Sequence, residues 1–116
     1  MYQNKVANLP VHTQALLTIL ERTLSPLGYK PDSHDGYTQY IDGNGGVAAT
    51  VRDQLTFRGE TFLSLRRSLL PWKDKRDLLS EARREGLAVG LGQQLSDDTF
   101  FYLVWPDYRA RASTGI

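Results

Sequence analysis

The run TFFYLVW at residues 99–105 is almost wholly apolar and ends the segment, residues 36–105, that decides the fold of this chain. In an extended strand, successive side chains point to opposite faces. The run therefore divides into two faces, with Phe100, Tyr102 and Val104 on one and Phe101, Leu103 and Trp105 on the other. A strand that is apolar on both faces is normally covered on both. Either helices cover both faces, or all helices pack on one face and the other needs a partner.

Short alternating runs before this stretch predict further strands. The sequence DGNGG at residues 42–46 favours a hairpin, because Asp, Asn and Gly tolerate positive φ angles. The turn-rich sequence DSHDG at residues 32–36 is interpreted as a link into the sheet. Strands are expected at residues 37–41, 47–52, 55–57, 61–66 (with a turn or bulge at 58–60), 87–91 and 99–105, with a loop at 93–98.

Two amphipathic helices are expected, at residues 10–24 and 71–85, because apolar side chains recur there at helical spacing. A proline near the start of each helix and Gly86 after the second are typical helix boundaries. The predicted fold class is α+β: a mostly antiparallel sheet of about five strands packed with two helices, in the order α-β-β-β-α-β-β. Residues 1–116 are expected to form a single domain, and residues 106–116 a polar tail that frays.

Composition excludes several classes of protein. The chain has 116 residues, a formal net charge of +1 and no cysteine. Disulfides, iron–sulfur clusters and cysteine nucleophiles are therefore excluded. A net charge near zero does not predict nucleic-acid binding. No apolar run approaches the roughly 20 residues that cross a bilayer, and no signal peptide is recognisable. We expect a cytoplasmic protein without a membrane association.

No catalytic, metal or cofactor motif stands up to inspection, so we expect no enzymatic activity, no cofactor and no metal. GNGGVA at residues 43–48 loosely matches a dinucleotide-binding loop, but a strand rather than a helix follows it. The positions that match a calcium loop lack its required glycine. Asp32, His34 and Asp35 could ligate a metal or carry a proton, although a solvated turn explains them better.

The remaining hypothesis is a non-enzymatic binding protein that docks on a macromolecule, either a protein or a protein–nucleic-acid complex, with a homodimer as a further arrangement. Small domains without motifs include many inhibitors and accessory proteins of mobile elements. Aromatic and Arg side chains dominate binding energy at most interfaces. The predicted partner-binding residues are Tyr40, Arg52, Phe62 and Arg66 on the exposed sheet face, with Trp72 nearby.

The alternative hypothesis is a nucleic-acid-binding module with a basic patch at the start of the second helix. The order helix, three strands, helix resembles the double-stranded-RNA-binding domain, in which such residues contact phosphates. Here Asp74 interrupts the cluster, and two further strands follow. The predicted nucleic-acid-binding residues are Arg66, Arg67, Lys73, Lys75 and Arg76.

Overall fold

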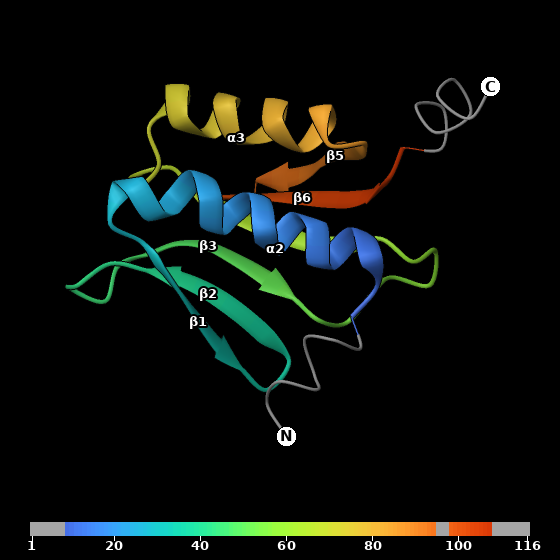
Figure 1. The fold of residues 1–116 in the computed structure, drawn as a ribbon, viewed down its shortest axis with the longest axis horizontal. Helices are drawn as coiled ribbons and strands as arrows, with labels where there is room; N and C mark the ends of the chain where they lie inside the picture. The colour runs from blue at the N-terminus through green and yellow to red at the C-terminus, as the bar shows by residue number, and fades with distance from the viewer. Residues whose placement is uncertain (1–8, 95–97, 108–116) are drawn as a thin grey trace.

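The computed structural model describes residues 9–94 and 98–107, and within them it has two α-helices and six β-strands (Figure 1). In chain order the elements are α2 (Val11–Leu24), the short 3-10 helix η1 (Ser25–Leu27), β1 (Lys30–His34), β2 (Tyr37–Ile41), β3 (Val47–Arg52), β4 (Thr61–Arg66), α3 (Trp72–Arg84), β5 (Leu87–Gln94) and β6 (Thr99–Pro106). The expected tail lies outside the described residues, except for Pro106, which ends β6, and Asp107, which donates its backbone N–H to the Gly86 carbonyl at 2.8 Å.

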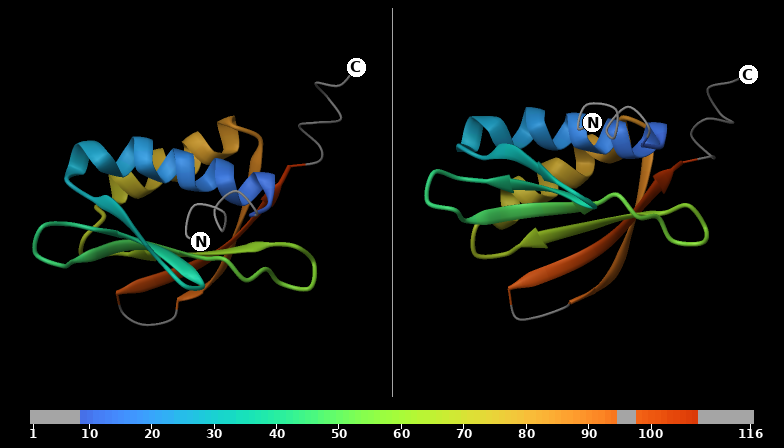
Figure 2. Two further views of the ribbon diagram at one scale, coloured as in Figure 1. Left: turned by 60° about the horizontal axis from the view of Figure 1, so that its bottom comes forward. Right: turned by 90° about the horizontal axis from the view of Figure 1, so that it is seen from below.

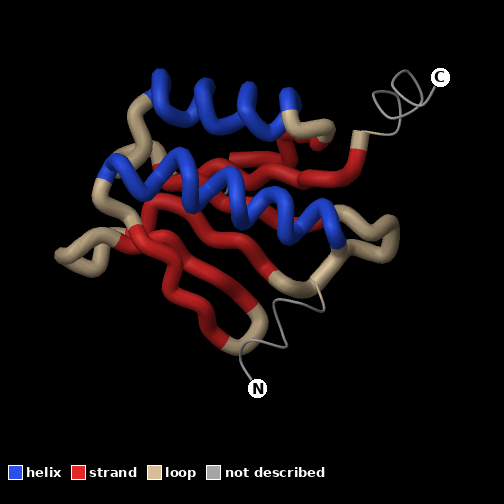
Figure 3. Tube along the Cα trace, in the orientation of Figure 1, coloured by secondary structure: helices blue, strands red, loops and turns tan. Residues whose placement is uncertain are grey.

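The strands form one antiparallel sheet in the order β1-β2-β3-β4-β6-β5. The predicted α+β class and the mostly antiparallel sheet with two helices are confirmed. The sheet has six strands rather than about five. Because β6 pairs antiparallel with both β4 and β5, strands β4 and β5 run parallel to each other. Helix α3 is thus a crossover connection from β4 to β5, and it lies beside β5 (Figure 3).

Two local predictions were wrong. The stretch expected as a link contains most of β1, which pairs with β2 through a tight turn at Gly36, where φ is +97°. Pro31 is tolerated in β1 because this is an edge strand, where a residue without an N–H can stand on the side that has no neighbour. Residues 55–57 are a loop instead of a strand. The Thr56 hydroxyl accepts hydrogen bonds from the backbone N–H groups of Arg58 and Glu60, and this local pairing replaces a ladder.

Both helices lie on the same side of the sheet, so the domain has two layers (Figure 2). The core fills the space between these layers, and the opposite face of the sheet carries no helix. The buried core side chains from the helices are Leu16, Ile19, Leu20 and Leu24 of α2 and Leu78 and Ala82 of α3. Those from the sheet include Tyr40, Ala49, Val51, Leu63, Leu65, Tyr102 and Val104. Of the two arrangements left open by the sequence, the structure has the one with an uncovered face.

Polar contacts fix α2 against the sheet. The Tyr40 hydroxyl donates to the backbone carbonyl of Leu17 at 3.0 Å. The hydroxyls of Thr13 and Thr61, both fully buried, lie 2.6 Å apart, and His12 Nε2 lies 2.9 Å from the Thr61 hydroxyl. Buried polar groups that find partners in this way set the position of a helix more sharply than apolar contacts alone.

His12 should make the stability of the fold depend on pH. Burial lowers the pKa of His12, and a backbone hydrogen bond at Gly59 only partly opposes this. The folded state therefore binds fewer protons on this ring than the unfolded state does, so stability is lost as the pH falls below about 6.5. We expect the free energy of unfolding to fall more steeply with acidification for the wild type than for His12→Gln. Urea denaturation of both proteins at a series of pH values around and below 6.5 measures this difference. An equal dependence of the unfolding free energy on pH in the two proteins would contradict the prediction.

Candidate docking surface

The uncovered face of the sheet carries a group of large apolar side chains, which we call the apolar strip: Phe62, Phe101, Leu103 and Trp105. Their neighbours in sequence, such as Leu63 and Tyr102, point into the core, so alternation places the strip on the opposite face. Phe62 pairs with Leu103 across β4 and β6. The rings of Phe62 and Phe101 have centroids 5.2 Å apart at 39°. All four side chains stay partly exposed.

Trp105 lies over a strand residue that has no side chain. A Cβ atom added at Gly90 of β5 would lie 2.9 Å from Cη2 and 3.0 Å from Cζ3 of the indole. The close approach requires glycine, because a methyl group would force the ring away. Gly90 therefore leaves room for the far edge of the indole over β5 and extends the apolar strip from β6 to the edge strand.

Substitution of Gly90 by alanine is expected to displace this indole toward water. In a Trp72→Phe background, where Trp105 is the sole tryptophan, its emission should shift to longer wavelength, with a loss of about 1 kcal/mol in unfolding free energy. Gly43→Ala is the matched control, because a Cβ there meets no atom within 4 Å. An unchanged spectrum for Gly90→Ala would show that the ring does not lie on the glycine.

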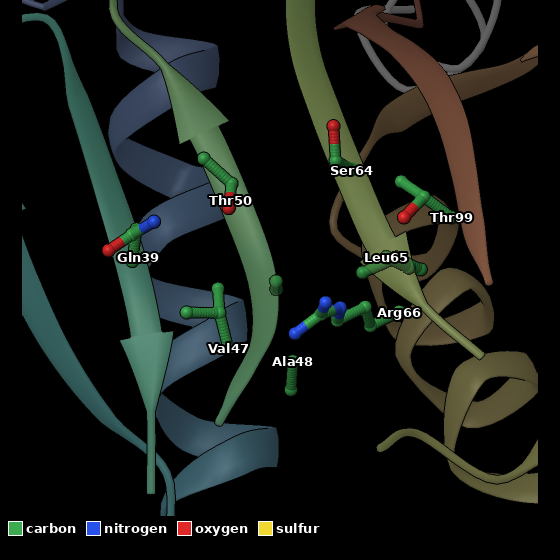
Figure 4. Close-up of a pocket in the computed structure, with 9 residues that line it drawn as sticks. Gln39, Val47, Ala48, Thr50, Ser64, Leu65, Arg66 and Thr99 are labelled. Carbon is green, nitrogen blue, oxygen red and sulfur yellow. The ribbon is translucent and has the colours of Figure 1, made fainter. Parts of the chain in front are cut away.

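The other half of the uncovered face is polar. Gln39, Thr50, Ser64 and Thr99 lie on the side of the sheet away from α2, around a hollow of about 290 Å³ (Figure 4). Arg66 extends across the end of this hollow toward Ala48 (Figure 4). The face thus combines an apolar half with a polar half.

Arg52 and Arg66 lie on this face of the sheet. The exposed Arg52 pairs with Phe62 across β3 and β4. Arg66 Nε lies 3.5 Å from Asp98 Oδ2, and hydrogen bonds from Ser68 hold the pKa of that carboxyl below its usual value. Half-exposed pairs such as Arg66–Asp98 are worth little in water. Both guanidinium groups therefore remain available to carboxylates of a partner.

The structure places the five predicted partner-binding residues in different parts of the molecule. Arg52, Phe62 and Arg66 lie on the uncovered face. Tyr40 was expected there, and this was wrong: its side chain is 1% exposed and contacts α2. Trp72 is 69% exposed but stands at the start of α3, in the helical layer.

The strip residues of β6 were absent from the predicted site. The alternation of side chains along β6 nevertheless indicates which of its residues share a face. Once the helices are known to cover one face only, alternate positions of TFFYLVW must lie on the other face. Phe101, Leu103 and Trp105 are therefore added to the candidate surface. Sequence patterns alone do not tell which face the helices cover.

The five basic residues predicted for nucleic acid do not share one surface role. Arg67, Lys73 and Arg76 are exposed. Lys75 is 9% exposed, and its Nζ lies 4.6 Å from the ring centroid of Trp72 and 4.4 Å from that of Phe100. Its expected place in a phosphate-binding patch was wrong, because the ammonium group is held between two rings in the helical layer.

The turn residues considered for metal binding form a simple pair. His34 Nε2 lies 2.8 Å from Asp32 Oδ2, and the His34 ring stacks on Tyr37 with centroids 4.8 Å apart. Across residues 9–94 and 98–107, no group of three or more His, Asp or Glu side chains gathers closely enough to hold a metal ion. Within the same residues, no helix has the length and apolar character needed to cross a bilayer.

Comparison of the chain with protein-family models, with curated proteins and with solved structures found no match. The candidate surface therefore has to be judged on its own geometry.

Proposed function

We propose that this chain is a non-enzymatic binding protein that docks on a protein partner through the uncovered face of its sheet. One observation carries the proposal: both helices cover the same face, while the opposite face presents the apolar strip beside Arg52 and Arg66. A contiguous group of aromatic side chains left in contact with water is typical of an interaction site. Aromatic and Arg residues are also the types enriched in binding hot spots.

The strip can supply part of the binding free energy of a complex. Complete burial of a Phe or Leu side chain is worth about 1.5–3 kcal/mol. The four strip residues are already partly buried, so each can contribute only a fraction of this. A sum of this size falls short of the roughly 8 kcal/mol of a micromolar complex, so the polar half of the face and its two arginines have to supply the rest. The two arginines predict that the partner has an apolar surface bordered by carboxylates.

Affinity capture with paired variants tests this function. The tagged wild type, a strip variant (Phe62→Ser with Leu103→Ser) and a helical control (Thr18→Ala with Ser80→Ala) are compared by quantitative mass spectrometry. Thr18 and Ser80 are exposed on α2 and α3. We expect a partner that the wild type and the control retain and the strip variant loses. Retention of every partner by a folded strip variant would contradict the proposal.

A second copy of the chain is the other occupant that such a face could accept. Sedimentation of the wild type and of the strip variant separates the two cases. A dimer that dissociates in the strip variant would identify the partner as the chain itself. A monomer in both proteins leaves a different protein as the partner, which the capture experiment identifies.

A further inference from the structure

A groove of about 420 Å³ lies between α3 and β6 on the helix-covered side of the sheet. Its lining combines two kinds of side chain. The apolar and aromatic members are Trp72, Leu79, Phe100 and Tyr102, and the cationic members are Lys75, Arg76 and Arg83. The volume falls within the range of sites that hold small organic molecules. The groove belongs to the helical layer, so it is separate from the apolar strip.

Lys75 is the unusual member of this lining. Only 9% of its surface is exposed, although its ammonium group keeps some contact with solvent, because no fully buried side-chain nitrogen of the described residues lacks a hydrogen-bond partner. Within the described part of the chain, no carboxylate lies in ion-pair reach of Lys75. Its ammonium group rests instead between the rings of Trp72 and Phe100. Each cation–π contact compensates only part of the desolvation of this ammonium group.

The surroundings of Lys75 add positive charge. Arg76 and Arg83 border the groove on the same helix. Asp77 Oδ1 lies 3.9 Å from Arg76 Nε, but Asp77 is outside the groove lining. An adjoining hollow of about 470 Å³ shares Trp72, Lys75 and Phe100 and adds Arg67. Burial and the charge of Arg67 both lower the pKa of Lys75. An anion in the groove would relieve this imbalance of charge.

We propose that the groove binds a small organic carboxylate with an apolar body, of the medium-chain fatty-acid type. The carboxylate pairs with Lys75 Nζ at the cationic side, and the body lies on Leu79, Phe100 and Tyr102. A neutral apolar ligand would leave the lysine uncompensated. An inorganic anion would leave the apolar lining in contact with water. A ligand with both parts satisfies both halves of the groove.

Single-tryptophan variants report where such a ligand binds. In Trp105→Phe the emission comes from Trp72 beside the lysine, and in Trp72→Phe it comes from Trp105 on the opposite face. We expect octanoate to change the emission of Trp72 saturably. Acetate has the charge without the body and 1-octanol has the body without the charge, so each should bind at least about tenfold more weakly. A response from Trp105 alone, or equal binding of octanoate and 1-octanol, would overturn the proposal.

Substitutions on α3 test the role of the lysine. Lys75→Met keeps an unbranched side chain that packs well against aromatic rings, and it should weaken octanoate binding at least about tenfold. Lys73→Met, at an exposed position of the same helix, should change it by less than about twofold. Equal affinity for the two variants would contradict the assignment.

If Lys75→Met does not fold, the role of the lysine can be tested in the wild-type protein. The pKa of Lys75, followed by the NMR shift of its Cε carbon, should rise when octanoate is added, because a nearby anion favours the charged ammonium. An unchanged pKa at saturating octanoate would show that the carboxylate does not approach Nζ.

Discussion

A Leu63→Ala variant is expected to lose about 2–5 kcal/mol of its free energy of unfolding. Leu63 is fully buried in the centre of the sheet, where it pairs with Val51 of β3 and Tyr102 of β6 and faces the helices. Truncation removes apolar contact and leaves a cavity that the two layers cannot close completely. Urea denaturation followed by circular dichroism measures the loss.

The preceding residue is the matched control. Phe62 lies on the uncovered face, so Phe62→Ala should cost less than about 1.5 kcal/mol although the side chain is larger. The ratio of the two losses therefore shows which face of β4 is the core. A greater loss for Phe62→Ala than for Leu63→Ala would contradict the two-layer arrangement.

Replacement of Phe101 by alanine is expected to weaken partner binding by at least about thirtyfold, or about 2 kcal/mol. Phe101 lies within the apolar strip and contacts Phe62, so a docked partner would bury it where water is excluded. Its loss should have little effect on the fold. Calorimetric titration of the wild type and the variant with the captured partner measures the change.

Ser80→Ala, in the helical layer, should leave that affinity within about twofold. Salt separates this account from nucleic-acid binding through Arg67, Lys73 and Arg76. Docking on an apolar strip should weaken only mildly with salt, whereas each phosphate contact adds to the salt dependence. A fall of more than about tenfold between about 50 and 200 mM salt, with no effect of Phe101→Ala, would favour the nucleic-acid hypothesis.

The fold class was predictable because the local signals agreed. Alternating apolar residues, a Gly-rich hairpin and two amphipathic helices all favoured a sheet with helices packed on it. Strand β1 was not predicted because Pro31 and the polar residues that follow it lack the alternating pattern of a strand. Its position depends on backbone pairing with β2 rather than on its own side chains. An edge strand can form in this way without a strong propensity.

Tyr40 shows why alternation did not assign the face of β2. The odd and even positions of this strand each include an aromatic and a polar residue, so neither set is clearly the core. The face of Tyr40 is set by a residue far along the chain, because its hydroxyl donates a hydrogen bond to the carbonyl of Leu17 on α2. A hydrogen bond over this sequence distance leaves no local signal.

The uncovered face depends on topology, which the sequence does not display. Strands β4 and β5 run parallel with β6 between them, and α3 must cross on one side to join them. Such crossovers have a nearly fixed hand, which fixes the side on which the helix packs. The order of strands in the sheet was needed before this rule could be applied.

Lys75 could have been recognised as a buried residue. It lies one helical turn before Leu78 and Leu79, on the stripe that α3 turns inward. Its charge alone resembles that of its exposed neighbours Lys73 and Arg76. The spacing of a cation relative to an apolar stripe is therefore more informative than its place in a run of charges.

Photo-crosslinking in cells tests the docking surface most directly. A benzophenone amino acid is placed at Phe62 on the apolar strip or at Thr18 on the exposed side of α2, and the chain is irradiated before lysis. We expect a discrete covalent adduct with one protein from position 62 and none from position 18. Adducts from position 18 alone, or equal adducts from both positions, would contradict docking through the uncovered face.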